Sequence, residues 1–258
     1  MKESERKHLL ERLDHHRLCL AEPGIVAREF SRDRSECQIL LASATAAGIA
    51  TLVAGETASA DRSAYTLEWK VYGHDGPANL VDSLLAAKFE PDDEEQVLVL
   101  PIAVGARAGV GALPPGTEIM RVDDERGLAE VAEISRDTGR RTVDAETRRL
   151  ASILRDTPDA MTVHVLRFEG EPVACGRTHY GKGSEFAELA GGRTKVAHRR
   201  CGYFSALVHH RLTEASARGR THALVDALPT SEPILRRLGF AILTSTRPYV
   251  YVPAGGAP

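Results

Sequence analysis

Residues 193–200 contain four cations and a histidine and no acidic residue. The run is followed by Gly202, and an apolar periodicity typical of a helix begins at Tyr203. Backbone N–H groups at the start of a helix lack partners within it and favour an anion. Gly202 lets the backbone approach a ligand closely, and the guanidinium groups of Arg199 and Arg200 can add bidentate contacts to phosphate. The pattern predicts an anion-binding loop, and the alternative is a solvated basic face.

The elements that position this loop follow from hydrophobic periodicity and turn residues. We predict strands over 118–122, 161–168, 172–180, 185–196 and 222–227, and helices over 127–135, 144–154 and 203–218. A short helix between Ser231, its expected N-cap, and Gly239 precedes two strand-like pieces around 244–247. Asp144 is the expected N-cap of the second helix, and Glu169-Gly170-Glu171 is typical of a hairpin. This order predicts an α/β fold with a mixed central sheet and helices on both faces.

Phe204 is bulky where a phosphate loop usually has a small residue. Only its backbone N–H has to face the anion, so the side chain is free to pack elsewhere. We expect it to lie on the apolar face of the helix over 203–218, with Leu207 and Val208.

A stretch rich in Gly, Ala and Pro, residues 101–116, has no hydrophobic period and is typical of a linker. It separates predicted domains over 1–100 and 117–258. Both domains contain a strand, a helix and a strand in the same order, with Phe89 or Phe240 after the helix. We interpret this as a diverged internal duplication, although strand–helix–strand units are common in any α/β protein.

The charge is unevenly divided along the chain. Residues 1–116 hold 12 Lys+Arg against 18 Asp+Glu, and residues 117–258 hold 21 against 18, which gives −6 and +3. An anionic ligand is therefore expected in the second half, while the net charge of −3 argues against nucleic acid as a partner. No apolar run approaches the ~20 residues of a membrane span, and the first residues lack a signal-peptide core. We expect a cytoplasmic protein without a membrane partner.

Cysteine and histidine spacing indicates neither a disulfide framework nor a metal site. The cysteines at 19, 37, 175 and 201 are scattered without a C-x-x-C pair. His164 and His179 fall within predicted strands, with no further ligand at metal-binding spacing. His209 and His210 are expected at the surface of the helix over 203–218.

Residues 117–258 resemble the GNAT acetyltransferase superfamily, whose members transfer acyl groups from acyl-coenzyme A, usually to amines. Its cofactor motif is Q/R-x-x-G-x-G/A, and the chain has Arg199-Arg200-Cys201-Gly202-Tyr203-Phe204, with phenylalanine at the last position. The preceding strand, the amphipathic helix and the ending PILRRLGF also agree. The resemblance implies an α/β (α+β) fold with a GNAT-like mixed central sheet flanked by helices. It further implies that residues 1–100 form a smaller, degenerate GNAT-like domain, as in tandem-GNAT proteins.

The resemblance also implies acetyl-CoA as cosubstrate and no metal. In the superfamily the strand before the loop carries a bulge and splays from its neighbour to admit pantetheine, and Gly191-Gly192 suit such a break. Main-chain groups of Thr194 and Val196 would pair with pantetheine and polarise the thioester carbonyl. The residues expected to bind the cofactor are Thr194, Lys195, Val196, Arg199, Arg200, Cys201, Gly202, Tyr203, Phe204 and Ser205.

Acyl transfer needs a proton acceptor, because an amine with a Lys-like pKa of ~10.4 is mostly protonated at pH 7. Glu188 resembles the general-base glutamate that the histone acetyltransferase branch carries at this place. Strand alternation puts it on one face with Phe186 and Ala190, a setting that raises the pKa of a carboxyl group. The alternative is a glutamate that faces outward from the strand.

The superfamily's usual general acid, a tyrosine in the last helix, is replaced by Leu235. Ser231, Tyr249 and Tyr251 are candidate substitutes, although a thiolate is already a tolerable leaving group. Asp226, at a strand end, could bind a cationic acceptor, or it could be an ordinary capping aspartate.

These residues predict an N-acyltransferase in which a small-molecule amine attacks the thioester directly. We expect the acceptor to enter against the region around 135–143. The alternatives are a non-catalytic acyl-CoA-binding or regulatory module and, from the basic run alone, an RNA-binding patch.

Overall fold

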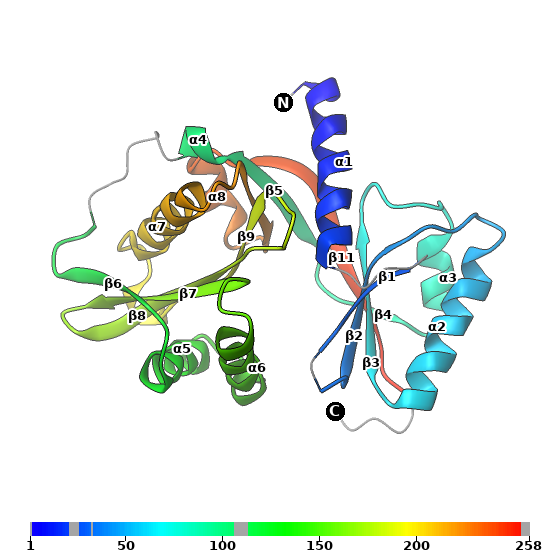
Figure 1. The fold of residues 1–258 in the computed structure, drawn as a ribbon, viewed down its shortest axis with the longest axis horizontal. Helices are drawn as coiled ribbons and strands as arrows, with labels where there is room; N and C mark the ends of the chain where they lie inside the picture. The colour runs from blue at the N-terminus through cyan, green and yellow to red at the C-terminus, as the bar shows by residue number, and fades with distance from the viewer. Residues whose placement is uncertain (1, 21–25, 32, 106–112, 254–258) are drawn as a thin grey trace. The chain divides into compact units, whose positions relative to one another are not determined.

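The chain divides into two compact units in the computed structural model, which describes residues 2–20, 26–31, 33–105 and 113–253 (Figure 1). Unit 1 comprises Met1–Leu98, Ala227–Glu232 and Ile242–Pro258, and unit 2 comprises Val99–Asp226 and Pro233–Ala241. The predicted domains over 1–100 and 117–258 differ from this division in where they place the end of the chain. Within the described ranges, no helix combines the length and the apolar character needed to cross a membrane.

Unit 1 contains a sheet in the order β1–β2–β3–β11, with β4 paired to β11. Its elements are α1 (Glu3–Leu20), β1 (Val26–Phe30), β2 (Glu36–Ala42), α2 (Ile49–Ser63), β3 (Thr66–Tyr72), α3 (Leu80–Ala86), β4 (Glu90–Pro91) and most of β11 (Ala241–Tyr251). β2 and β3 are parallel and joined through α2, whereas β11 is antiparallel to β3 and joins them from the far end of the chain. β5 (Glu95–Pro101) runs across the division between the units.

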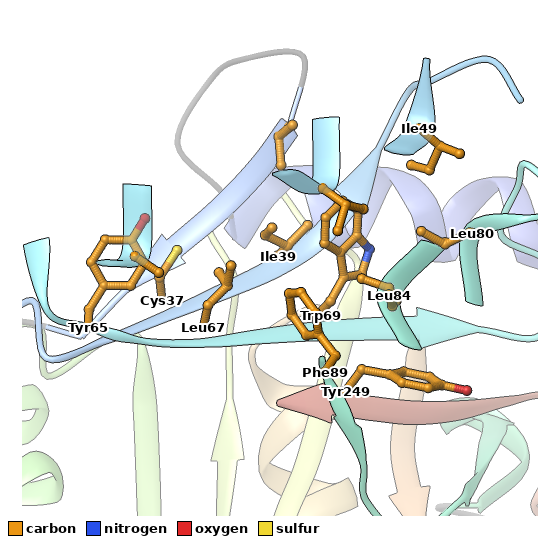
Figure 2. Packing of buried hydrophobic residues seen from close by; sticks show 13 residues of the cluster. Cys37, Ile39, Ile49, Tyr65, Leu67, Trp69, Leu80, Leu84, Phe89 and Tyr249 are labelled. Atoms are coloured by element: carbon orange, nitrogen blue, oxygen red, sulfur yellow. The ribbon is translucent and has the colours of Figure 1, made fainter. Parts of the chain in front are cut away.

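The core of unit 1 lies between its sheet and the apolar faces of α2 and α3. Figure 2 shows Trp69 of β3 beside Phe89 and Tyr249, with Leu84 of α3 next to them. The rings of Trp69 and Phe89 meet edge to face, with centroids 6.5 Å apart. Such burial of aromatic surface is the main term that stabilises a small domain.

Unit 2 contains a sheet in the order β10–β9–β8–β7–β6. The elements are α4 (Ile102–Gly105), β6 (Thr117–Arg121), α5 (Glu125–Asp137), α6 (Val143–Asp156), β7 (Met161–Phe168), β8 (Glu171–His179), β9 (Phe186–Thr194), the 3-10 turn η1 (Val196–His198), α7 (Tyr203–Ala217), β10 (His222–Ala227) and α8 (Glu232–Arg237). The strands β6 to β9 are antiparallel, and β10 is parallel to β9 through the crossover helix α7.

Helices cover both faces of this sheet, as predicted. Val131 and Ile134 of α5 and Leu150 of α6 pack with Val163 and Cys175 on one face. On the other face, a second cluster joins α7 to β7 and β8 (Figure 1); its members are Tyr203, Leu207, Leu166, Val173 and Ala174. Adjacent residues of β8, such as Ala174 and Cys175, therefore serve opposite helix layers.

Several local expectations are confirmed or corrected. The hairpin at Glu169-Gly170 is confirmed, because both residues have positive φ, as a type I′ turn requires. Asp144 does not cap α6: the N-cap is Thr142, and Asp144 lies in the first turn, where it pairs with Arg136. The two strand pieces expected around 244–247 form the single strand β11.

The stretch 101–116, expected to be a linker, is partly structured. Ile102 to Gly105 form α4, and the Ile102 side chain is buried. Residues 106–112 lie outside the described part of the chain.

Candidate functional site

Strand β9 parts from β10 after its third residue. Their parallel register runs from Phe186 opposite His222 to Glu188 opposite Leu224. Beyond Glu188, β9 continues as far as Thr194 in antiparallel pairing with β8. The edge of β9 that faces β10 therefore leaves the ladder at Glu188. Beyond this point Ala190 O accepts from Arg211 and Thr194 O accepts from Arg199, and other backbone groups are available to a ligand.

A bulge follows directly, at the paired glycines. Gly191 and Gly192 of β9 stand opposite the single residue Gly176 of β8, because the register passes from Arg177–Ala190 to Cys175–Arg193. Gly191 has a φ of 58°, a conformation that other residues adopt only with strain. This confirms the break predicted at Gly191-Gly192.

Side chains pack closely against these glycines. A Cβ atom on Gly191 would lie 2.5 Å from Arg177 Nη1, and one on Gly192 would lie 2.8 Å from Phe204 Cε2. A Cβ atom on Gly176 would meet Arg211 Nη1 at 2.8 Å. The absence of side chains at these three positions is therefore what lets the bulge receive its neighbours.

The basic loop lies between β9 and α7, as predicted. Arg200 and Gly202 have positive φ, and α7 begins at Tyr203 without a side-chain cap. The first helical hydrogen bond to Gly202 O comes from Ala206 N, so the N–H groups of residues 203–205 precede the intrahelical ladder. Arg199 and Cys201 are exposed beside them. This end of a 15-residue helix has the donors and the charge that an anion requires.

Phe204 only partly follows its expected packing. Leu207 and Val208 are buried, but Phe204 is half-buried and its ring lies over Gly192 of β9. The buried ring at this end of α7 is Tyr203, which stacks beside Phe168 at 5.9 Å. Phe204 thus forms part of the wall at the bulge and leaves its N–H at the helix terminus.

Thr194, Lys195 and Val196 connect β9 to the loop. Lys195 N–H donates to Val173 O of β8, so strand alternation directs the main-chain groups of Thr194 away from β8. The buried Thr194 Oγ1 has no hydrogen-bond partner among the described residues. Lys195 Nζ donates to Glu133 and Glu171, and Val196 N–H donates to Asp137 Oδ2 at 2.7 Å. Carboxylates on α5 and β8 thus hold two groups that were expected to face the cofactor.

A polar cluster lies beside Glu188 on the sheet face that carries α5 and α6. Glu188 is half-buried and stands opposite His179 of β8. Arg177 Nε donates to His179 Nε2 at 3.2 Å, and Arg177 Nη1 donates to Glu146 Oε1 at 2.7 Å. Arg193 donates to both oxygens of Glu146, each at 2.9 Å.

Glu146 is the carboxylate that holds this cluster together. Burial by itself would raise the pKa of Glu146, but hydrogen bonds and charge from Arg193 and Arg177 lower it below its ordinary value. Arg193 Nη1 also donates to Ser135 Oγ on α5 at 2.6 Å. The cluster thereby joins β8, β9, α5 and α6 beside Glu188.

Arg211 enters the bulge from the opposite face of the sheet. It lies on α7 and is fully buried, and its guanidinium donates to the carbonyl oxygens of Leu207, Arg177 and Ala190. Burial lowers its pKa to about 10. A buried cation held by carbonyl dipoles places positive charge directly behind the bulge.

The remaining predicted residues belong to other parts of the chain. Tyr249 is buried in the hydrophobic core of unit 1 (Figure 2). Ser231 also belongs to unit 1, whereas Glu188 belongs to unit 2. Asp226 is half-buried near the end of β10. Leu235, at the position where the resemblance would place the usual acid, is buried in α8.

The expectation that His209 lies at the surface is wrong. His209 is buried, and burial lowers its pKa. Strand residue His164 has the neighbours Glu214 and His210, both on α7, which its spacing in the sequence did not reveal.

Sequence reasoning missed the partners of Arg177, Arg193 and Arg211. Glu146 precedes Arg177 by 31 residues, and no local spacing links the two. The only available signal was strand alternation, which places Arg177 and His179 on one face of β8. Arg211 reads as a surface residue in the sequence because arginine is seldom buried without a carboxylate.

One group of side chains in unit 1 has ligand atoms close enough together for a metal ion. Its members are Asp14, His74 and Asp75. Arg17 donates to both aspartates, at 2.8 Å to Asp14 and at 2.7 Å to Asp75 Oδ2. A guanidinium therefore already pairs with both carboxylates.

Comparison with known proteins identifies the fold. No family model and no curated protein sequence matches the chain. Among solved structures, a GCN5-related N-acetyltransferase from Kribbella flavida is similar with a TM-score of 0.70 at 16% identity, over 96% of this chain and 95% of that one. A tandem GNAT protein from the clavulanic acid biosynthesis pathway is similar with a TM-score of 0.64 at 14% identity, over 92% and 86%.

A third similar structure is a GCN5-related N-acetyltransferase from Sphaerobacter thermophilus, with a TM-score of 0.56 at 14% identity over 90% of this chain and 77% of that one. The predicted duplication within the chain stays a prediction, because these similarities concern the fold as a whole. With its mixed sheets flanked by helices, the chain has the fold of the GCN5-related N-acetyltransferases over nearly its whole length.

Proposed function

We propose that the chain is an acyl-CoA-dependent N-acyltransferase that uses acetyl-CoA and acts on an amine. The observation that carries the proposal is the parting of β9 from β10 at Glu188, next to the uncapped start of α7. An opening in a sheet beside an anion-binding helix terminus suits a long ligand with a pyrophosphate. The GNAT fold supports the same assignment.

The proposed cofactor site runs from the bulge to the start of α7. The N–H groups of Tyr203, Phe204 and Ser205 would bind the pyrophosphate, and the side chains of Arg199 and Arg200 would add charge. Main-chain groups of Thr194 would pair with pantetheine. Buried polar atoms normally have a hydrogen-bond partner, and the buried Thr194 Oγ1 has none among the described residues. This supports a ligand at this place.

In the proposed reaction, the amine nitrogen attacks the thioester carbonyl carbon and a C–N bond forms. Glu188 accepts a proton from the amine, and the C–S bond breaks as the thiolate leaves. The positive charge of Arg211 behind the bulge would stabilise the thioester carbonyl oxygen, which becomes negative when the amine attacks. Because Leu235 is apolar, the thiolate leaves without a proton donor from that position.

Substitution of Glu188 by Gln is expected to lower kcat by ~10²-fold, because the general base is lost while the shape is kept. The pH dependence of kcat should lose its acidic limb, and the affinity for acetyl-CoA should stay within ~2-fold. The matched control is Glu118→Gln, which alters an exposed strand glutamate paired with Arg167. A pH profile unchanged in Glu188→Gln would remove this residue from the mechanism.

A non-catalytic acyl-CoA-binding module is the second candidate, and the buried Leu235 in place of an acid favours it. Calorimetry with acetyl-CoA, together with a thiol-release assay over a panel of amines, separates the two functions. Binding with thiol release on at least one amine supports the transferase. Tight binding without release on any amine supports the module.

A further inference from the structure

The guanidinium group of Arg177, beside Glu188, has an open edge at its Nη2 atom. Its Nε and Nη1 atoms are engaged by His179 and Glu146, but Nη2 makes no hydrogen bond in the described part of the chain. About a quarter of its side chain is exposed (26%), so a small molecule can reach it. Because His179 stands opposite Glu188, Arg177 and Glu188 lie on the same face of the sheet.

The three guanidinium groups around the bulge outnumber the two carboxylates, Glu146 and Glu188, whose charge acts on Arg177. Glu146 is shared between the guanidinium groups of Arg177 and Arg193. Behind the bulge, the hydrogen bonds that Arg211 makes to described residues all go to carbonyl oxygens. Burial lowers the pKa of Arg177, which reflects a cation that has lost hydration and is incompletely compensated. Such a site gains most from an added anion.

The spacing suits one small molecule that carries both charges. Arg177 lies two residues along β8 from His179, the partner of Glu188, and two residues of a strand span ~7 Å. Because both side chains stand out from the same face of the sheet, hydrogen bonds of ~3 Å can rise from the sheet instead of running along it, and the short link between an amine and a carboxylate can then bridge the span. An ammonium group at Glu188 and a carboxylate at Arg177 would each meet the opposite charge.

We infer that the acceptor is an amine that also carries a carboxylate, bound by the open edge of Arg177 while Glu188 receives the amine proton. This inference rests on the proposed acyltransferase function. Arg177 is then a specificity-determining residue, in addition to its contacts with Gly191 and Glu146. A purely structural Arg177 would give no preference between an acid and its neutral analogue.

The test compares amino acids with their carboxamides as acceptors, such as glycine with glycinamide and β-alanine with its amide, in the acetyl-CoA thiol-release assay. We expect kcat/KM to favour the acid by ~10-fold or more, mainly through KM, because a charge-assisted hydrogen bond is lost in the amide. Arg177→Gln should remove this preference, and Arg177→Lys should restore part of it. The control Arg167→Gln breaks the ion pair of Arg167 with Glu130 and should keep the preference.

The outcomes separate the inference from the function on which it rests. Equal or better rates for the amides would overturn the inference and leave the acyltransferase function in place. An acid preference that persists in Arg177→Gln would overturn the role of Arg177. Binding of acetyl-CoA without release on any acceptor would overturn both. If Arg177→Gln fails to fold, the wild-type preference for the acid over the amide and its size in Arg177→Lys still test the inference.

Discussion

His164, on β7, is a buried histidine that its surroundings keep neutral. Its side chain is 3% exposed, and Nε2 lies 3.6 Å from Glu214 Oε2. Its ring meets that of His210 edge to face, with centroids 4.6 Å apart. Burial first, and then the charge of His210, lower the pKa of His164 to about 4 despite the opposing effect of Glu214. Because its pKa differs between the folded and the unfolded chain, His164 makes the free energy of unfolding depend on pH.

The free energy of unfolding is expected to fall as the pH is lowered from 6.5 to about 4, by up to ~3 kcal/mol from His164. In this window the unfolded chain binds a proton at His164 that the folded chain does not, so protonation favours unfolding. Below about pH 4 both states are protonated and the contribution stays constant.

Urea denaturation at pH 7 and pH 4.5 checks this expectation in the wild type and in His164→Gln. The variant should show a smaller difference between the two pH values. Some dependence should remain, because burial also lowers the pKa of His209 and His210. A variant with the full wild-type difference would contradict the assignment to His164.

At the scale of elements, the bulge in β9 performs several tasks together. It stands at the point where β9 has left β10, it receives Phe204 from α7, and it lies under Arg177 from β8. Two glycines are needed because Arg177 approaches the backbone from one face of the sheet and Phe204 approaches it from the other. The bulge therefore couples the shape of the proposed cofactor site to that of the acceptor site.

Gly191→Ala is expected to destabilise the fold more than Gly139→Ala, although both replace a glycine with positive φ. Gly139 has no atom within 4 Å of its would-be Cβ, so only the backbone cost of ~1–2 kcal/mol applies. At Gly191 the Cβ would also displace Arg177, which adds ~1 kcal/mol or more. Thermal denaturation of the two variants measures the difference. Equal losses of stability would show that the Arg177 side chain can move aside without a cost in free energy.

Much of this architecture could be predicted from periodicity. The strands β6 to β10 and the helices α5 to α7 lie within a few residues of their expected bounds, because each has a clear apolar face and turn residues at its ends. The glycine pair and the basic loop could also be predicted, because each is a run of neighbouring residues in the sequence. The expected N-cap at Asp144 was wrong because Thr142 and Asp144 are both plausible cap types and only the backbone decides.

The remaining features depend on contacts distant in sequence. The pairing of Arg193 with Glu146 spans 47 residues, and no spacing rule connects a strand end with a helix interior at that distance. The burial of His209 and Arg211 on α7 could not be predicted because helical periodicity marks apolar faces and treats polar residues as exposed. The interaction of Val196 N–H with Asp137 depends on how α5 lies over β9.

At the scale of the whole molecule, the final strand β11 belongs to unit 1. Residues Thr246 to Tyr251 pair with Leu67 to Tyr72 of β3, and Tyr249 packs in the core around Trp69 (Figure 2). The sequence did not reveal this, because a strand motif indicates that a strand forms and leaves its partner unspecified. Unit 1 is thus built from both ends of the chain.

Deletion of residues 242–258 is expected to unfold unit 1, because it removes one strand of the sheet and part of the core. Trp69, the single tryptophan, is 1% exposed, so its fluorescence should shift to longer wavelength when the core opens. The control Tyr249→Phe keeps the ring and should leave the emission unchanged. Unshifted emission in the deletion variant would show that unit 1 is stable without β11.

The position of β11 has a consequence for folding during synthesis. Most of unit 1 precedes unit 2 in the sequence and leaves the ribosome before it, yet its sheet lacks a strand until residues 242–258 emerge. All segments of unit 2 are available by Ala241. Until residues 242–258 emerge, β3 therefore presents an unpaired edge, which is a site for wrong pairing with other chains.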